Sequence, residues 1–258
     1  MSISTRPPLG VLRQLSRAVL ADRLIGDELM RVTMARVDVD PQSSSASVTD
    51  LAAAFIKSWR MAARDHALGR ERGRVAAAFS DAALKEALPA PPSDERLVLL
   101  LVDVLGFSPA EAARIVGTDA RPGQLLAAAR DALVVEAGAR AVIVEDEPLI
   151  AADLRAILER MNVAVVGEAR SAEDAVAVAA DAAPDIILAD YNLAGRATGL
   201  DAVVRIKQDR DCPVIFITGY PDRVLQGDEV EPDFVISKPY TADNVRAAVV
   251  HCLDARRG

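Results

Sequence analysis

Hydrophobic positions in the first part of the chain recur with the period of a helix. Leu12, Leu15, Val19 and Leu24 are spaced three to five residues apart, which indicates an amphipathic stripe. Proline-rich residues 89–92 break the pattern. Comparable patterns predict further helices at residues 29–37, 51–63, 94–105 and 121–136. We therefore expect an all-α domain over residues 1–138.

A helix start signal lies within this domain, at the sequence SPAE. The hydroxyl of Ser108 and the carboxylate of Glu111 are placed to satisfy backbone N–H groups of the first turn. Pro109 suits the first helical position, and Gly117 suits a helix end. The sequence predicts a short helix between them, followed by the helix at 121–136.

From residue 139 the pattern changes to short β-rich runs separated by helical stretches. Such alternation predicts a parallel sheet covered by helices on both faces. Five strands in about 120 residues suit the flavodoxin-like order, whose sites lie at the carboxyl ends of the strands. The expected strands are 141–144, 163–166, 186–189, 214–218 and 234–237, with helices at 150–161, 172–182, 200–207, 222–226 and 242–252. The expected fold is thus a helical domain followed by an α/β domain over residues 139–258.

Charge is divided unevenly between the two domains. Residues 1–138 carry 17 basic and 17 acidic side chains, so the net charge of −8 belongs to the second domain. A chain with a pI of about 4.9 lacks the basic footprint of a nucleic-acid-binding protein. Two cysteines and no long apolar run indicate a reduced, cytoplasmic protein without membrane segments.

Polar residues that can carry chemistry gather where the expected strands end. Parallel strands end at one edge of a sheet, so these side chains should meet there. Carboxylates at this edge suit Mg²⁺, and a neighbouring hydroxyl and ammonium suit an incoming phosphoryl group. The residues concerned are Glu145, Asp146, Asp190, Asn192, Thr218 and Lys238.

The motifs VIVEDEP, LADYNL, FITG and SKP, in this order, resemble the receiver domain of two-component response regulators. The resemblance implies that Asp190 accepts a phosphoryl group from a sensor histidine kinase. It further implies that Glu145 and Asp146 form an acidic pair, and that Mg²⁺ lies at this pair, Asp190 and the carbonyl of Asn192. Thr218 and Lys238 are implied to contact the phosphoryl group. The peptide bond before Pro239 is implied to be cis. The alternative is an α/β domain with incidental acids.

The helical domain resembles a sigma factor of the extracytoplasmic-function type. Residues 9–60 resemble its region 2, and residues 93–136, including GFSPAEAARIVG, resemble the helix-turn-helix of its region 4. A sigma-like domain before a receiver with FITGYP and EPDFVISKPY is the arrangement of the PhyR family, which controls the general stress response of alphaproteobacteria. The resemblance implies a non-enzymatic anti-anti-sigma switch that captures a NepR-like anti-sigma factor.

The candidate recognition helix favours a protein partner over DNA. Residues 121–136 offer only Arg121 and Arg130 as cations, beside Asp131 and Glu136, whereas a DNA reader needs basic and polar side chains there. No direct DNA binding is therefore expected. Three alternatives stay open: an ordinary core helix, a divergent paralogue with another protein partner, and a regulator that binds promoters directly.

A short joint between the domains predicts that they pack together. Val235 occupies the position where many receivers carry a switch aromatic residue. Phe234 and Tyr240 flank this position, and we expect them to pack between the domains.

Overall fold

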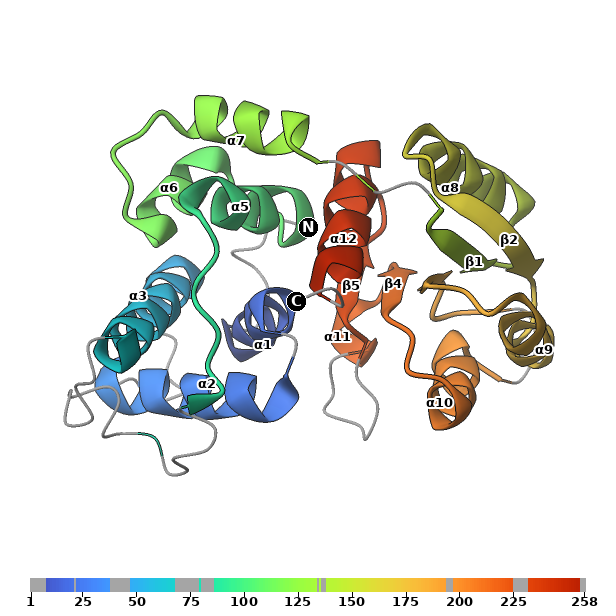
Figure 1. Cartoon of the computed structure of the whole chain (residues 1–258), viewed down its shortest axis with the longest axis horizontal. Coiled ribbons are helices and arrows are strands. Elements are labelled where there is room, and N and C mark those ends of the chain that lie inside the picture. The colour runs from blue at the N-terminus through green and yellow to red at the C-terminus, as the bar shows by residue number, and fades with distance from the viewer. Residues whose placement is uncertain are drawn as a thin grey trace. The chain divides into compact units, whose positions relative to one another are not determined.

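The computed structural model describes residues 8–20, 22–37, 47–67, 79, 86–133, 135, 138–193, 197–224 and 232–255 (Figure 1). The chain forms two compact units, Met1–Ala129 and Arg130–Gly258. The first is helical and the second contains a five-stranded parallel sheet, which confirms the expected fold class. The domain boundary at residues 138 and 139 stays a prediction.

The helical unit follows the expected pattern but differs at several element boundaries. The helix expected at 51–63 spans residues 48–67, and the helix expected at 121–136 ends at Asp131. The second helix starts before the expected residues, because the Asp22 carboxylate accepts the N–H of Ile25 at 3.0 Å and so caps the helix. Leu24 is 65% exposed there and does not extend the apolar stripe. The single helix expected at 94–105 is an α-helix that continues as a π-helix. The elements are α1 (Pro8–Val19), α2 (Arg23–Val37), α3 (Val48–Ala67), α5 (Asp94–Leu99), η3 (Leu100–Val104), α6 (Pro109–Val116) and α7 (Pro122–Asp131).

Helix α3 is the centre of the helical unit and packs against α1, α2 and α6. Its aromatic residues Phe55 and Trp59 are fully buried. The Trp59 indole N–H donates to the carbonyl of Pro89 at 2.8 Å. Arg60 donates to the carbonyl of Val116 and to the carboxylate of Asp94, each at 2.6 Å. Helix α3 therefore ties the first helices of the unit to the segment at residues 89–116.

Helices long and apolar enough to cross a membrane are not found in the part of the chain that the structure describes.

The second unit has the flavodoxin-like strand order β2-β1-β3-β4-β5, as expected. The strands are β1 (Arg140–Val144), β2 (Ala164–Ala169), β3 (Ile186–Ala189), β4 (Val214–Thr218) and β5 (Phe234–Ser237). The helices are α8 (Pro148–Arg160), α9 (Ala172–Ala182), α10 (Gly199–Asp209), α11 (Pro221–Val224) and α12 (Ala242–Ala255). Of the helix expected at 222–226, residues 225 and 226 lie outside the described residues.

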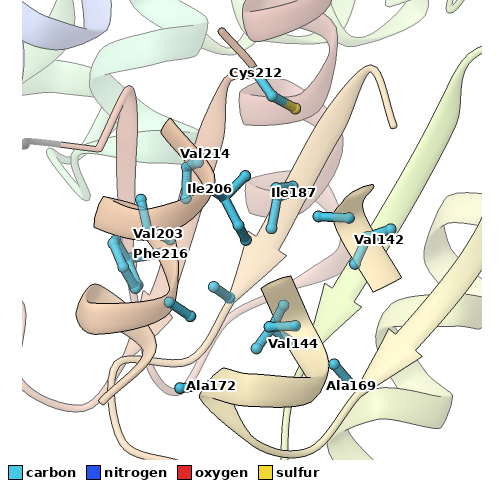
Figure 2. Close-up of a cluster of buried hydrophobic side chains, with 14 of the residues drawn as sticks. Val142, Val144, Ala169, Ala172, Ile187, Val203, Ile206, Cys212, Val214 and Phe216 are labelled. Carbon is cyan, nitrogen blue, oxygen red and sulfur yellow. The ribbon is translucent and has the colours of Figure 1, made fainter. Parts of the chain in front are cut away.

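Alternate strand residues build the core on one face of the sheet. Val142 and Val144 of β1 lie in the same cluster as Ile187 and Phe216, and Figure 2 shows them beneath the helices that cover this face. Those helices are α9 and α10, which contribute mostly Ala and Val. Helix α12 contacts α8 and the strands β3 and β5. Helices α8 and α12 therefore form the layer on the opposite face of the sheet.

Two aspartates align the strands at the amino edge of the sheet. Asp185 precedes β3, and its carboxylate accepts the N–H of Arg140, the first residue of β1, at 2.8 Å. Asp233 precedes β5 and accepts the N–H of Val214, the first residue of β4, at 2.7 Å. Each aspartate also donates its own N–H to the carbonyl of the same neighbour. The starts of β1 and β3, and those of β4 and β5, are thus paired.

The capping box at α6 generates a stability prediction. Both of its hydrogen bonds are present, with Ser108 as the cap and Glu111 as its partner. Ser108→Ala should lower the free energy of unfolding of the helical unit by about 1 kcal/mol, because the N–H of Glu111 loses its acceptor. Urea unfolding followed by the fluorescence of Trp59, the single tryptophan, measures this. The control Glu111→Gln keeps an acceptor and should lose less than half as much; an unchanged midpoint for Ser108→Ala would contradict the assignment.

Candidate functional site

The strands bring the predicted acidic residues together at the carboxyl edge of the sheet. Glu145 follows β1 and Asp190 follows β3, which is the neighbour of β1. Carboxylate oxygens of Glu145, Asp146 and Asp190 all lie within 4.8 Å of one another. The N–H of Asp190 donates to the carbonyl of Val144 at 2.8 Å, which continues the strand pairing up to the site.

Lys238 reaches this cluster from the end of β5. Its ammonium lies 2.7 Å from Oδ2 of Asp190 and 2.9 Å from Oε2 of Glu145. The side chains of Glu145, Asp190 and Lys238 are 1%, 8% and 19% exposed, so a single cation compensates two carboxylates that water hardly reaches. The Lys238–Pro239 peptide bond is cis, in agreement with the receiver resemblance.

Burial and charge shift the pKa values of this site. Burial raises the pKa of the Glu145 carboxyl, and the Lys238 ammonium offsets only part of this effect. Burial lowers the pKa of Lys238, but its hydrogen bonds to Asp190 and Glu145 outweigh burial and leave that pKa raised. The ammonium therefore stays charged where it holds the two carboxylates.

Asn192 and Thr218 lie at the same edge with other hydrogen bonds. Asn192 is exposed, and its N–H donates to Oδ1 of Asp190 at 3.2 Å. Thr218 is fully buried, and its hydroxyl accepts the N–H of Tyr220 at 3.1 Å. Its carbonyl accepts the N–H of Lys238 at 2.8 Å. The roles of Asn192 as a metal ligand and of Thr218 as a phosphoryl contact stay predictions.

Phe234 and Tyr240 make contacts within the receiver unit. Phe234 is buried, and its ring packs edge-on against His251 of α12 with centroids 5.1 Å apart. Burial and then a hydrogen bond to Asp153 of α8 raise the pKa of the half-buried Tyr240 phenol. Sequence reasoning missed Asp153, because no motif links this helix position to the end of β5. The expected interdomain role of both aromatics stays a prediction.

The donor set fits a hard divalent cation beside an anion. Three carboxylates converge without histidine or cysteine, and Mg²⁺ takes oxygen ligands of this kind. With one ammonium against three carboxylates, the formal charge of the cluster is negative, which a divalent cation would balance. Lys238 would then supply positive charge beside a phosphoryl group, as predicted from the sequence.

Comparison with known proteins places this geometry in a class. The family model "response regulator receiver domain" matches residues 141–250. The phyllosphere-induced regulator PhyR of Methylorubrum extorquens is 33% identical over 251 residues, 95% of this chain and 91% of the relative. The crystal structure of the response regulator PhyR from Brucella abortus has a TM-score of 0.77 and 32% identity, over 100% of this chain and 96% of that one. The anti-anti-sigma factor PhyR from Bartonella quintana has a TM-score of 0.75 and 31% identity, over 99% and 97%.

The fold and the acidic edge therefore define a response regulator with a carboxyl-terminal receiver domain. The match along almost the whole chain goes further. The chain belongs to the PhyR family of anti-anti-sigma response regulators.

The shared ammonium generates a prediction about stability. Lys238→Met should lower the free energy of unfolding of the receiver unit by about 3 kcal/mol without Mg²⁺, because two buried carboxylates lose their counter-charge. Millimolar Mg²⁺ should restore part of this loss. Urea unfolding followed by circular dichroism, with and without the metal, measures both effects.

A second lysine of the same unit provides the control. Lys207 pairs with Asp233 at 3.0 Å in a more open setting, so Lys207→Met should cost less than about 1 kcal/mol and show no dependence on Mg²⁺. Equal losses for the two variants would contradict the role given to Lys238.

Proposed function

We propose that the chain is a phosphorylation-gated switch in which a phosphoryl group on Asp190 makes the helical unit available to an anti-sigma factor of the NepR type. The observation that carries the proposal is the position of Asp190. Its carboxylate lies in a cluster of three carboxylates and within 2.7 Å of the Lys238 ammonium. Sequestering the anti-sigma factor would free the sigma factor of the stress response, in the cytoplasm.

The transfer step follows from the residues at the edge. A carboxylate oxygen of Asp190 attacks the phosphorus of a kinase phosphohistidine; the new O–P bond forms as the P–N bond breaks, and its electron pair returns to the imidazole. Mg²⁺, held by Asp146, Asp190 and the carbonyl of Asn192 beside Glu145, would neutralise charge on the phosphoryl oxygens when bound. The ammonium of Lys238 would leave Glu145 and contact the new phosphoryl group.

The surface of α7 supports a protein partner rather than DNA. Arg130 is the single basic residue within its bounds. The exposed positions of the helix carry small or uncharged side chains and one acid, namely Gly123, Gln124, Ala127, Ala128 and Asp131. A recognition helix needs cations to neutralise phosphates and polar groups to reach base edges. Helix α7 therefore offers few of the side chains that a direct contact with promoter DNA would need.

The relatives support the choice of partner. PhyR of Bartonella quintana is described as an anti-anti-sigma factor, and a structure of that protein in complex with the anti-sigma factor NepR exists. This chain is 31% identical to that protein over 99% of its length. An anti-sigma factor of the same class is the partner we assign.

Phosphorylation is tested first. Acetyl phosphate and Mg²⁺ should add one phosphoryl group to the wild-type chain, because Asp190 lies beside two other carboxylates and the Lys238 ammonium. Asp190→Asn should abolish the adduct, as read by intact mass. The control Glu147→Gln removes an exposed carboxylate beside the site and should leave the adduct intact. An adduct that persists in Asp190→Asn would reject the acceptor.

Coupling between phosphorylation and partner binding is tested by calorimetry. A NepR-type anti-sigma factor should bind the phosphorylated chain about 5–150-fold more tightly than the unmodified chain, the range of typical coupling free energies. Asp190→Asn, treated with acetyl phosphate, should keep the weaker affinity. Affinities that differ by less than about 0.5 kcal/mol would mean that the receiver does not gate the helical unit.

A further inference from the structure

Gly199, the first residue of α10, lies directly against the backbone of Asp190. A Cβ built on Gly199 would overlap the carbonyl oxygen of Asp190 and lie 3.0 Å from its carbonyl carbon and 3.4 Å from the ring of Phe216. The N–H of Gly199 donates to the carbonyl of Tyr191 at 2.8 Å. The start of α10 is thus seated on the peptide that follows the proposed phosphoryl acceptor.

This contact differs from those of the other described glycines. Gly26 and Gly167 are also crowded, but an added Cβ there would meet side chains, those of Ser16 and Val178. Gly219 faces open space although it follows Thr218 at the same edge. Among the glycines that the structure describes, Gly199 is the one where an added methyl group meets backbone, which cannot rotate away as a side chain can.

The peptide of Asp190 has little freedom to give way. Its N–H is bound to the carbonyl of Val144, and its carboxylate oxygens accept from the N–H of Asn192 and from Lys238. The start of α10 is fixed as well, since Thr198 and Asp201 form a capping box around Gly199. An added methyl group must therefore displace the Asp190 peptide, the first turn of α10, or both.

We propose that Gly199 is a positioning residue for phosphorylation: the absence of its side chain sets the backbone of Asp190, and thereby the direction of the acceptor carboxylate. The proposal rests on the proposed function. A displaced Asp190 peptide moves the carboxylate relative to Lys238 and to the metal ligands, and moves Asn192 with it. Misplacement of a reacting group by 1 Å can slow a reaction by about 100-fold.

The test compares Gly199→Ala with Gly167→Ala in the full chain. Intact mass follows phosphorylation by acetyl phosphate over time at a series of Mg²⁺ concentrations. Gly199→Ala should react at least about tenfold more slowly at saturating Mg²⁺ and should need more Mg²⁺ for half of its maximal rate. Gly167→Ala crowds the same unit in β2, away from the acceptor, and should keep both values within twofold of the wild type as long as the variant is folded under the assay conditions. Urea unfolding of both variants supplies the stability comparison.

A second pair of variants tests the proposal in case the Gly199→Ala chain does not fold. Thr198→Ala loosens the same helix start without adding atoms and should slow phosphorylation, whereas Ser171→Ala removes the corresponding cap of α9 and should not. A wild-type rate and Mg²⁺ dependence in Gly199→Ala would overturn the proposal, and so would equal rates for Thr198→Ala and Ser171→Ala. A phosphoryl adduct that persists in Asp190→Asn would overturn the proposed function instead. The two failures are therefore distinguishable.

Discussion

One ammonium group compensates two buried carboxylates at the carboxyl edge of the receiver sheet, and the site depends on this interaction. Charges taken out of water are costly unless they are paired and hydrogen-bonded. Glu145 and Asp190 end neighbouring strands, whereas Lys238 follows β5, which is separated from β3 by β4. The long side chain of lysine spans this gap. The order of the strands in the sheet is therefore also what allows Lys238 to compensate the two carboxylates.

The same arrangement would make the site responsive to a phosphoryl group on Asp190, as proposed above. The Lys238 ammonium lies at similar distances from Glu145 and Asp190, so a new anion at Asp190 would compete with Glu145 for it. Burial raises the pKa of the Glu145 carboxyl, and the Lys238 ammonium opposes this effect. A change at one oxygen would act through Lys238 on β5, which this lysine follows, and on the end of β4, whose Thr218 carbonyl accepts the Lys238 N–H.

Sequence reasoning predicted what depends on periodicity and on strand ends. The strand order, the capping box at Ser108 and the meeting of Glu145, Asp146, Asp190 and Lys238 follow from local patterns and from the convergence of parallel strands. It missed features that depend on how close two segments approach in space. The extension of β2 to Ala169, the π-helical turn after Leu99 and the seat of Gly199 on Asp190 are of this kind, since no local pattern encodes the neighbour.

Asp185 and Asp233 at the amino edge of the sheet also determine where the charged residues lie at the opposite, carboxyl edge. Asp185 and Asp190 flank β3, and Asp233 and Lys238 flank β5, so a hydrogen bond that aligns the start of a strand also decides where its last residue falls. A slip of two residues would keep every side chain on its face yet carry Asp190 or Lys238 about 7 Å along the sheet, out of reach of the other. Strand register is thus set by hydrogen bonds between two aspartates and the backbone at the amino edge, at the opposite end of the strands from the charges that need the alignment.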